Sequence, residues 1–139
     1  MLTGYFAKQR DYIALGLTPV AICLSTPTWY NGLNYTKLAP SKSILFDYKY
    51  NETYKGDKEH YITRYTNDIL NKLDYKEIVK ELEALTKTTS DKIILMCYEK
   101  PNDFCHRHLV SNWLVEKGIE CCELDLKDKP YEVLEETLV

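Results

Sequence analysis

The amino-acid sequence predicts a single α/β domain of three layers, built around a mostly parallel sheet. Two apolar runs, "AICLS" at residues 21–25 and "KIILMCY" at residues 92–98, have the length and composition of buried strands. The second run is apolar almost throughout, which is typical of a parallel strand covered on both faces. A helical pattern and a further strand-like run follow it, and this strand–helix–strand order indicates parallel α/β architecture. We therefore expect the strands around Ile22 and Leu95 to be central.

Length and charge limit the kinds of protein that this chain can form. Its 139 residues suit one domain, expected over residues 1–139, and 45% of them are hydrophobic, which is enough for a core. The net charge of −3 argues against bulk binding of nucleic acid, although it leaves room for a local basic pocket. No apolar run approaches the roughly 20 residues that span a bilayer, and the N-terminus lacks a signal-peptide core. Five cysteines, an odd number, suit reduced thiols, so we expect a cytoplasmic protein without membrane association.

The segment between the two apolar runs combines a long loop with two helices. Pro27, Gly32 and Pro40 interrupt residues 26–41, which predicts a loop beyond a strand end, a common place for function. Apolar side chains at three- and four-residue steps then predict a helix over residues 57–73. A second helix of the same kind is expected to begin at Asp74.

A third helix and a last strand are expected after the second apolar run. Residues 100–102, "KPN", end the strand, and Asp103 suits the N-cap of a helix over residues 104–117. Gly118 is a natural stop for that helix. The run "IECCELDL" at residues 119–126 alternates in the manner of another strand.

The turn between this strand and this helix, "CYEKPNDFCHRHL", holds the densest set of reactive side chains. Alternate residues of a strand share a face, so Cys97 and Glu99 should point the same way. Cys105, His106 and Arg107 are expected in the first helical turn, where backbone N–H groups lack partners. The helix dipole and the guanidinium group of Arg107, which can donate two parallel hydrogen bonds, together predict an anion-binding site at the carboxyl end of the strand.

Each of these side chains has a role that its chemistry suits. Cys105 is the candidate nucleophile, because a helix N-terminus and a nearby cation favour the thiolate. Glu99 could act as a general base or hold a ribose hydroxyl or a base edge, and His106 could carry protons. Cys97 is expected to be structural or a resolving partner. Arg107 is expected to bind the anion.

Two other interpretations remain open from the residues alone. Arg107 could simply pair with Glu99 and fasten the turn, while His106 caps backbone carbonyls. Zinc is a further alternative, with Cys97, Cys105 and His106 as ligands and a fourth thiol from residues 121 or 122. Because structural zinc sites usually use short paired cysteine spacings, which are absent here, no residue is assigned to a metal. A P-loop, a dinucleotide glycine fingerprint and a G-x-S-x-G elbow are also absent.

The same stretch resembles the C-x-E-x₅-C-H-R signature of the domain-of-unknown-function 488 family. The matching positions are Cys97, Glu99, Cys105, His106 and Arg107. The resemblance extends from about residue 5 to residue 124 and includes "GLNYTKLAPS" and "YITRYTNDIL". It implies a compact, Rossmann-like α/β domain in which the five side chains line a pocket. It does not imply a particular reaction.

The chain also departs from that family. Many members carry an Asp-Val-Arg-like segment followed by proline at the end of the second strand, where this sequence has "CLSTP" at residues 23–27. The resemblance therefore indicates a divergent branch. In it, Ser25, Thr26, Trp29 and Tyr35 are expected to supply polar and stacking contacts to a ligand instead.

These observations lead to one expected function and two alternatives. We expect a small pocket enzyme or sensor that acts on a nucleotide-like or other anionic ligand through the Cys-Glu-Cys-His-Arg cluster. The alternatives are a non-catalytic module that binds a nucleotide or a protein, and a structural domain stabilised by zinc. The sequence identifies no cofactor and no oligomeric state.

Overall fold

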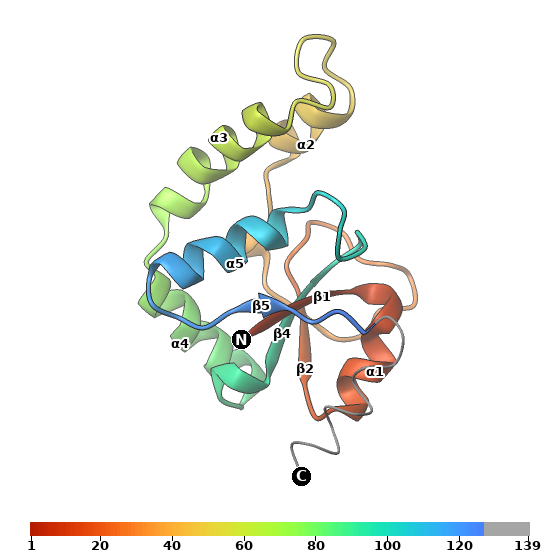
Figure 1. Ribbon diagram of the computed structural model, residues 1–139, viewed down its shortest axis with the longest axis vertical. Coiled ribbons are helices and arrows are strands. Elements are labelled where there is room, and N and C mark those ends of the chain that lie inside the picture. The colour runs from red at the N-terminus through yellow and green to blue at the C-terminus, as the bar shows by residue number, and fades with distance from the viewer. Residues whose placement is uncertain (127–139) are drawn as a thin grey trace.

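The computed structural model describes residues 1–126 and contains one five-stranded sheet in which every neighbouring pair is parallel (Figure 1). The remainder of the expected domain 1–139, residues 127–139, lies outside the described part. The strand order is β3-β2-β4-β1-β5. The strands are β1 (Leu2–Tyr5), β2 (Thr18–Ala21), β3 (Leu33–Asn34), β4 (Ile93–Cys97) and β5 (Cys122–Glu123).

Helices cover both faces of the sheet. The α-helices are α1 (Gln9–Ala14), α2 (Lys42–Lys49), α3 (Lys58–Asp68), α4 (Tyr75–Thr86) and α5 (His106–Glu116). Short 3₁₀ turns lie at η1 (Phe6–Lys8), η2 (Thr36–Leu38), η3 (Leu70–Lys72) and η4 (Ser90–Lys92). α2 and α3 pack on one another and extend beyond the sheet (Figure 1). Within residues 1–126, no helix is both long and apolar enough to cross a membrane.

Two hydrophobic cores, one on each face of the sheet, confirm the three-layer α/β fold. Successive side chains of β4 alternate between them, because a strand exposes its residues to opposite faces. Leu95 packs in the larger core with residues of α3, α4 and α5, such as Tyr65 and Leu82. Ile94 and Met96 pack in the smaller core, which α1 covers through Tyr12. β4 is the middle strand and β2 is interior, as the apolar runs predicted.

Several element boundaries differ from the sequence-based expectation. β2 lies at Thr18–Ala21 rather than at residues 21–25. The Ile22 N–H still donates to the Met96 carbonyl at 3.1 Å, but the Ile22 carbonyl accepts from His106 instead of continuing the ladder. The last strand is confined to Cys122–Glu123. The expectation that Asp103 caps α5 is wrong, because the N-cap is Cys105 and the helix begins at His106.

Other helix ends agree with their sequence signals. The Asp57 carboxylate caps α3 by accepting from the His60 N–H at 3.0 Å. Asp74 caps α4 in the same way through the Lys76 N–H at 2.9 Å. Gly118 follows α5 with a φ of 89°, a left-handed conformation that glycine adopts without a steric cost. These caps fix where each helix begins and ends relative to the sheet.

Strand β1 has no counterpart among the predicted elements. It lies between β4 and β5, so its pairing partners are about 90 and about 120 residues away in the sequence. Gly4 lies under the ring of Tyr12, and a Cβ at residue 4 would meet the Tyr12 hydroxyl oxygen at 2.5 Å. The short segment "LTGY" has no distinct periodicity, so only its pairing identifies it as a strand.

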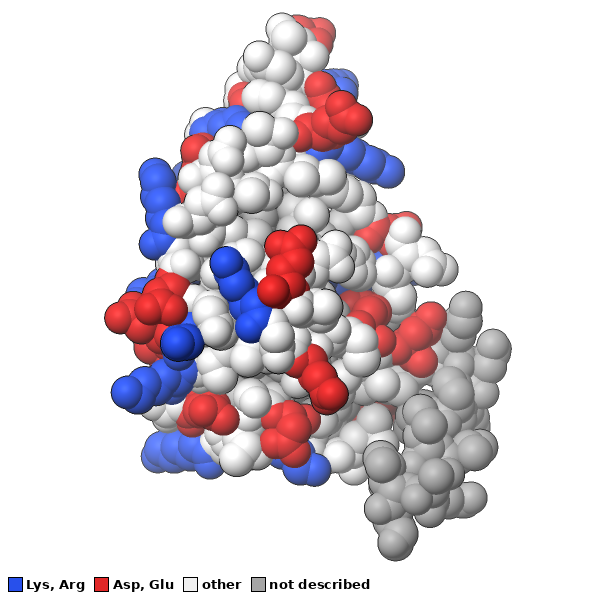
Figure 2. Space-filling model, turned by 60° about the vertical axis from the view of Figure 1, so that its left-hand side comes forward, with Lys and Arg blue, Asp and Glu red and all other residues white. Residues whose placement is uncertain are grey.

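Surface charge is mixed in sign. On the face drawn in Figure 2, Lys and Arg side chains are interspersed with Asp and Glu. The fields of interspersed positive and negative charges largely cancel at a distance, so this face has little long-range electrostatic field.

Candidate functional site

A pocket of about 170 Å³ opens beyond the carboxyl ends of β2 and β4. Ligands of open parallel α/β sheets bind at this edge. The turn from β4 to α5 forms one wall, and α2 and α3 form another. The lining residues are Cys23, Leu24, Ser25, Pro40, Leu45, Tyr48, Lys49, Tyr61, Cys97, Tyr98, Glu99, Phe104, Cys105 and His106.

Two thiols and one imidazole meet at the base of this pocket. Cys97 ends β4, and Cys105 and His106 stand at the start of α5, so the turn between them brings the three together. Cys97 Sγ lies 3.5 Å from Nε2 and 3.8 Å from Nδ1 of His106, and Cys105 Sγ lies 3.9 Å from Nδ1. All three side chains are buried, with exposed fractions of 1%, 4% and 6% in chain order.

The backbone of β2 orients the imidazole. His106 Nε2 lies 2.6 Å from the Ile22 carbonyl oxygen. A carbonyl oxygen only accepts hydrogen bonds, so Nε2 carries the proton and donates it. Nδ1 is therefore the ring nitrogen left to interact with the Cys105 sulfur, 3.9 Å away.

The pKa values of the two thiols are shifted in opposite directions. A hydrogen bond from Cys97, then a hydrogen bond and electrostatic attraction from His106 and the charge of Arg107, lower the pKa of Cys105 to about 3 despite its burial. Burial, together with the neighbouring Cys105, raises the pKa of Cys97 well above its usual range. Cys105 is thus the thiolate of the pair and Cys97 is the thiol.

Glu99 lies on the pocket wall beside Cys105. Burial raises the pKa of its carboxyl group, and the charge and hydrogen bond of Cys105 raise it further. A carboxyl group with a raised pKa retains its proton closer to neutral pH, so it can give a proton to a ligand and take it back. Glu99 and Cys105 thus place a carboxyl group and a thiol in the lining of the same pocket.

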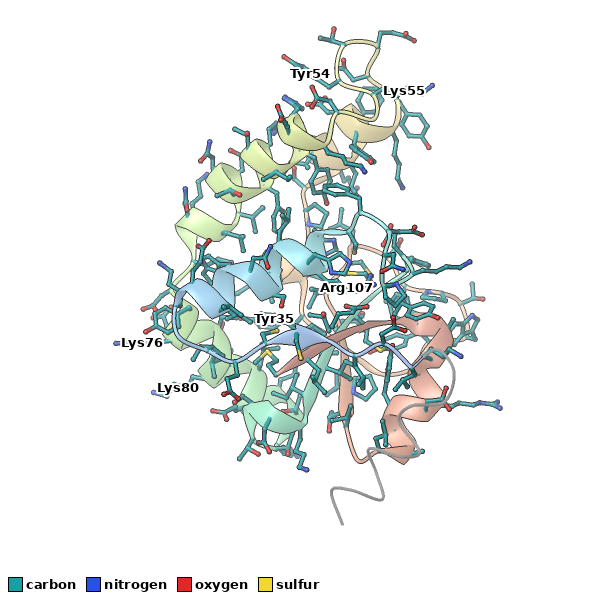
Figure 3. All side chains as sticks on the ribbon, viewed as in Figure 1. Tyr35, Tyr54, Lys55, Lys76, Lys80 and Arg107 are labelled. Carbon is teal, nitrogen blue, oxygen red and sulfur yellow. The ribbon has the colours of Figure 1, made fainter. Side chains whose placement is uncertain are left out.

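The expected place of Arg107 at the pocket needs correction. Arg107 is fully buried under the first turn of α5 (Figure 3) and is not part of the pocket lining. Its Nε and Nη2 donate to the two carboxylate oxygens of Glu123 in β5, at 3.0 and 2.9 Å. The helix therefore points Arg107 toward β5 and not toward the cleft, and its partner is Glu123 instead of Glu99. Arg107 acts on Cys105 through its charge.

The residues expected to replace the missing Asp-Val-Arg segment divide into two groups. Ser25 lines the pocket, whereas Thr26, Trp29 and Tyr35 do not. Trp29 is 60% exposed and lies edge-on to Phe6. The Tyr35 hydroxyl is buried and donates to Glu81 at 2.8 Å. Thr26 and Trp29, in the loop after β2, and Tyr35, after β3, thus lie outside the pocket lining.

An aromatic wall is the part of the pocket that was not predicted. The rings of Tyr48, Tyr61 and Phe104 contact one another, with centroids 5.1 to 5.5 Å apart. Tyr61 also belongs to the larger hydrophobic core. The three rings come from α2, α3 and the turn before α5, so no local pattern links them. Lys49, the last residue of α2, adds the one ammonium group of the lining.

Fold and site together define a parallel three-layer α/β domain with a thiol-lined pocket at the carboxyl edge of its sheet. Residues 17–118 match the family described as the active DUF488-N3 subclade, designated DUF488-N3a. Because the match covers more than half of the chain, the chain belongs to this family. No curated protein and no solved structure gave a significant match.

Proposed function

We propose that this protein is an enzyme whose substrate is a small, nucleotide-like molecule. In this proposal Cys105 is the nucleophile and Glu99 is the proton donor and acceptor. One observation carries the proposal: the Cys105 sulfur, the Glu99 carboxyl group and three aromatic rings line the same pocket. The description of the family as an active subclade agrees with an enzyme.

The size and lining of the pocket suggest which part of the ligand enters. A cavity of about 170 Å³ is smaller than the roughly 300–1,000 Å³ of pockets that enclose drug-sized ligands. A single heterocycle fits it, and the rings of Tyr48, Tyr61 and Phe104 offer a surface on which a base can stack. Lys49 is exposed at the end of α2, where it could pair with a phosphate outside the cavity.

The chemistry proposed for the site is covalent addition. The Cys105 thiolate forms a bond to an electrophilic ring carbon, and the displaced π-electron pair moves to a ring nitrogen. That nitrogen takes the proton of Glu99, which becomes a carboxylate. Reversal of both transfers releases the sulfur. Cys97 and His106 hold the thiolate in place before the addition.

A thermal-shift screen of free bases, nucleosides and nucleoside monophosphates at fixed ionic strength tests this proposal. We expect a subset to raise Tm, and mass spectrometry of the wild-type protein to show a covalent adduct of the ligand mass on Cys105, whereas Cys105→Ser should retain binding without the adduct. Lys49→Ala should weaken the binding of a monophosphate about tenfold or more, since a hydrogen bond to a charged group contributes about 1.5–3 kcal/mol. The affinity for a nucleoside should be unchanged. Lys37→Ala is the matched control, because Lys37 pairs with Glu81 outside the pocket lining.

Two outcomes would overturn the proposal. A flat Tm for every compound would exclude the nucleotide-like ligand. Tight binding without any covalent adduct on Cys105 would instead assign the protein to the class of binding modules.

A further inference from the structure

We propose that Cys97, Cys105 and His106 form a three-ligand zinc site whose fourth position opens into the pocket, so that zinc reversibly blocks the Cys105 sulfur. This goes beyond the proposed function, because the site would bind zinc whether or not Cys105 reacts with a substrate. It also differs from the structural zinc domain that the sequence left open, which needed a fourth cysteine.

The distances between the three donor atoms fit a tetrahedral zinc ion. Zinc bonds to thiolate sulfur at about 2.3 Å and to imidazole nitrogen at about 2.0–2.1 Å, which places bound S and N atoms roughly 3.6 Å apart. His106 Nδ1 lies 3.8 Å from Cys97 Sγ and 3.9 Å from Cys105 Sγ. One donor atom from each of the three residues lies within 4.8 Å of the others. Small side-chain movements would therefore complete the coordination.

The surroundings of His106 match those of a metal-ligating histidine. Such a residue usually donates its second ring N–H to a carboxylate or a backbone carbonyl, which fixes the tautomer. Here Nε2 donates to the Ile22 carbonyl at 2.6 Å, and the Ile22 N–H is itself bonded to the Met96 carbonyl. Nδ1 is consequently the ring nitrogen left to bind a metal, 3.8 and 3.9 Å from the two sulfur atoms.

Charge and access also suit zinc. Two thiolates and a neutral imidazole balance the charge of Zn²⁺, and their burial shields the ion from water. All three ligands line the pocket, so the pocket provides the path for entry and an open coordination position. Glu99 borders that position without belonging to the cluster of three donors.

Neither thiol considered from the sequence as a fourth ligand, Cys121 or Cys122, belongs to the donor cluster. Cys122 lies in β5. Cys97 is the last residue of β4, and β1 lies between these two strands in the sheet. In the described part of the chain, the donor cluster contains only Cys97, Cys105 and His106. A site with three protein ligands leaves the fourth position of zinc to water or to a ligand that enters through the pocket.

Zinc titration of chelator-treated protein in competition with a chromophoric chelator tests the site. We expect one zinc per chain, and a Co²⁺ derivative with sulfur-to-cobalt charge-transfer absorption. His106→Ala and Cys97→Ala should each weaken binding by more than about 100-fold, because loss of an outer-shell partner alone costs about 10- to 100-fold. Cys122→Ala, which removes an exposed thiol outside the cluster, should leave the affinity unchanged.

Iodoacetamide labelling with and without zinc separates this inference from the proposed function. Zinc at one equivalent should protect Cys105 of the wild-type protein and leave Cys122 labelling unchanged. If zinc binds stoichiometrically but Cys105 of the zinc-free protein is not labelled, the zinc site stands and the role of Cys105 as a nucleophile is refuted. A reactive Cys105 without zinc protection, or zinc bound in less than stoichiometric amount to folded wild-type protein, would refute the site.

Discussion

The guanidinium of Arg107 forms two parallel hydrogen bonds to the carboxylate of Glu123, and this pair ties the first turn of α5 to the edge strand β5. The Arg107 side chain is fully buried and that of Glu123 is 17% exposed. Removal of one partner from a buried pair leaves an uncompensated charge, which costs far more than the loss of an exposed pair. The pair therefore contributes to the position of Cys105 and His106 by holding the start of their helix.

We expect Arg107→Met to lower the free energy of unfolding by about 3 kcal/mol, measured by urea denaturation. The double variant Arg107→Met/Glu123→Met should recover a substantial part of this loss, because neither charge then remains unpaired. Lys37→Ala, which breaks the exposed pair with Glu81, should cost less than about 1 kcal/mol and serves as the control. Equal losses for Arg107→Met and Lys37→Ala would contradict this account.

The depressed pKa of Cys105, about 3, predicts an unusual pH dependence of its alkylation in chelator-treated protein. An ordinary thiol has a pKa of about 8.5, so its thiolate fraction and its labelling rate fall about tenfold per pH unit below that value. Cys105 is already a thiolate at pH 5, and its rate should stay nearly constant from pH 8 to pH 5. Mass-spectrometric mapping follows the exposed Cys122 in the same sample as the internal control. A tenfold decline per unit for Cys105 would rule out a stabilised thiolate.

Gly4→Ala should destabilise the protein by about 1–3 kcal/mol, since the new Cβ would overlap the buried ring of Tyr12. The same change in a Tyr12→Leu background should cost less, because the phenol ring that causes the overlap is absent. Thermal or urea unfolding of the four proteins completes this double-mutant cycle. Additive losses would show that Gly4 is required for another reason.

The chain should fold without zinc, because the apolar side chains buried in its two hydrophobic cores can stabilise the fold unaided. Far-UV circular dichroism of chelator-treated protein should show native helix content and a cooperative transition. Zinc should then raise Tm, by a free energy of about 2.7 kcal/mol at 100 times its Kd. Loss of the cooperative transition on chelation would instead indicate a structural metal.

The sequence by itself determined the fold class and the chemical character of the site. β4 was evident because five consecutive apolar residues, followed by a break at residues 100–102, are typical of a strand covered on both faces. Asp57, Asp74 and Gly118 marked helix ends because capping depends on bonds to residues two or three positions away. Cys97, Glu99, Cys105 and His106 lie on one strand-to-helix turn, which explains why they line the same pocket, whereas Arg107 of the same stretch points toward β5.

Tertiary structure alone decided what that reactive set contacts. The sequence could not show that β1 is an interior strand, because its partners β4 and β5 are distant in the chain. Nor could it direct Arg107 to Glu123 or His106 to the Ile22 carbonyl, since each contact joins separate elements of the sheet and helix layers. The aromatic wall likewise exists only where α2 and α3 pack against the turn before α5. Local patterns fix conformation over a few residues, whereas the direction of a side chain across a packed interface depends on how whole elements are layered.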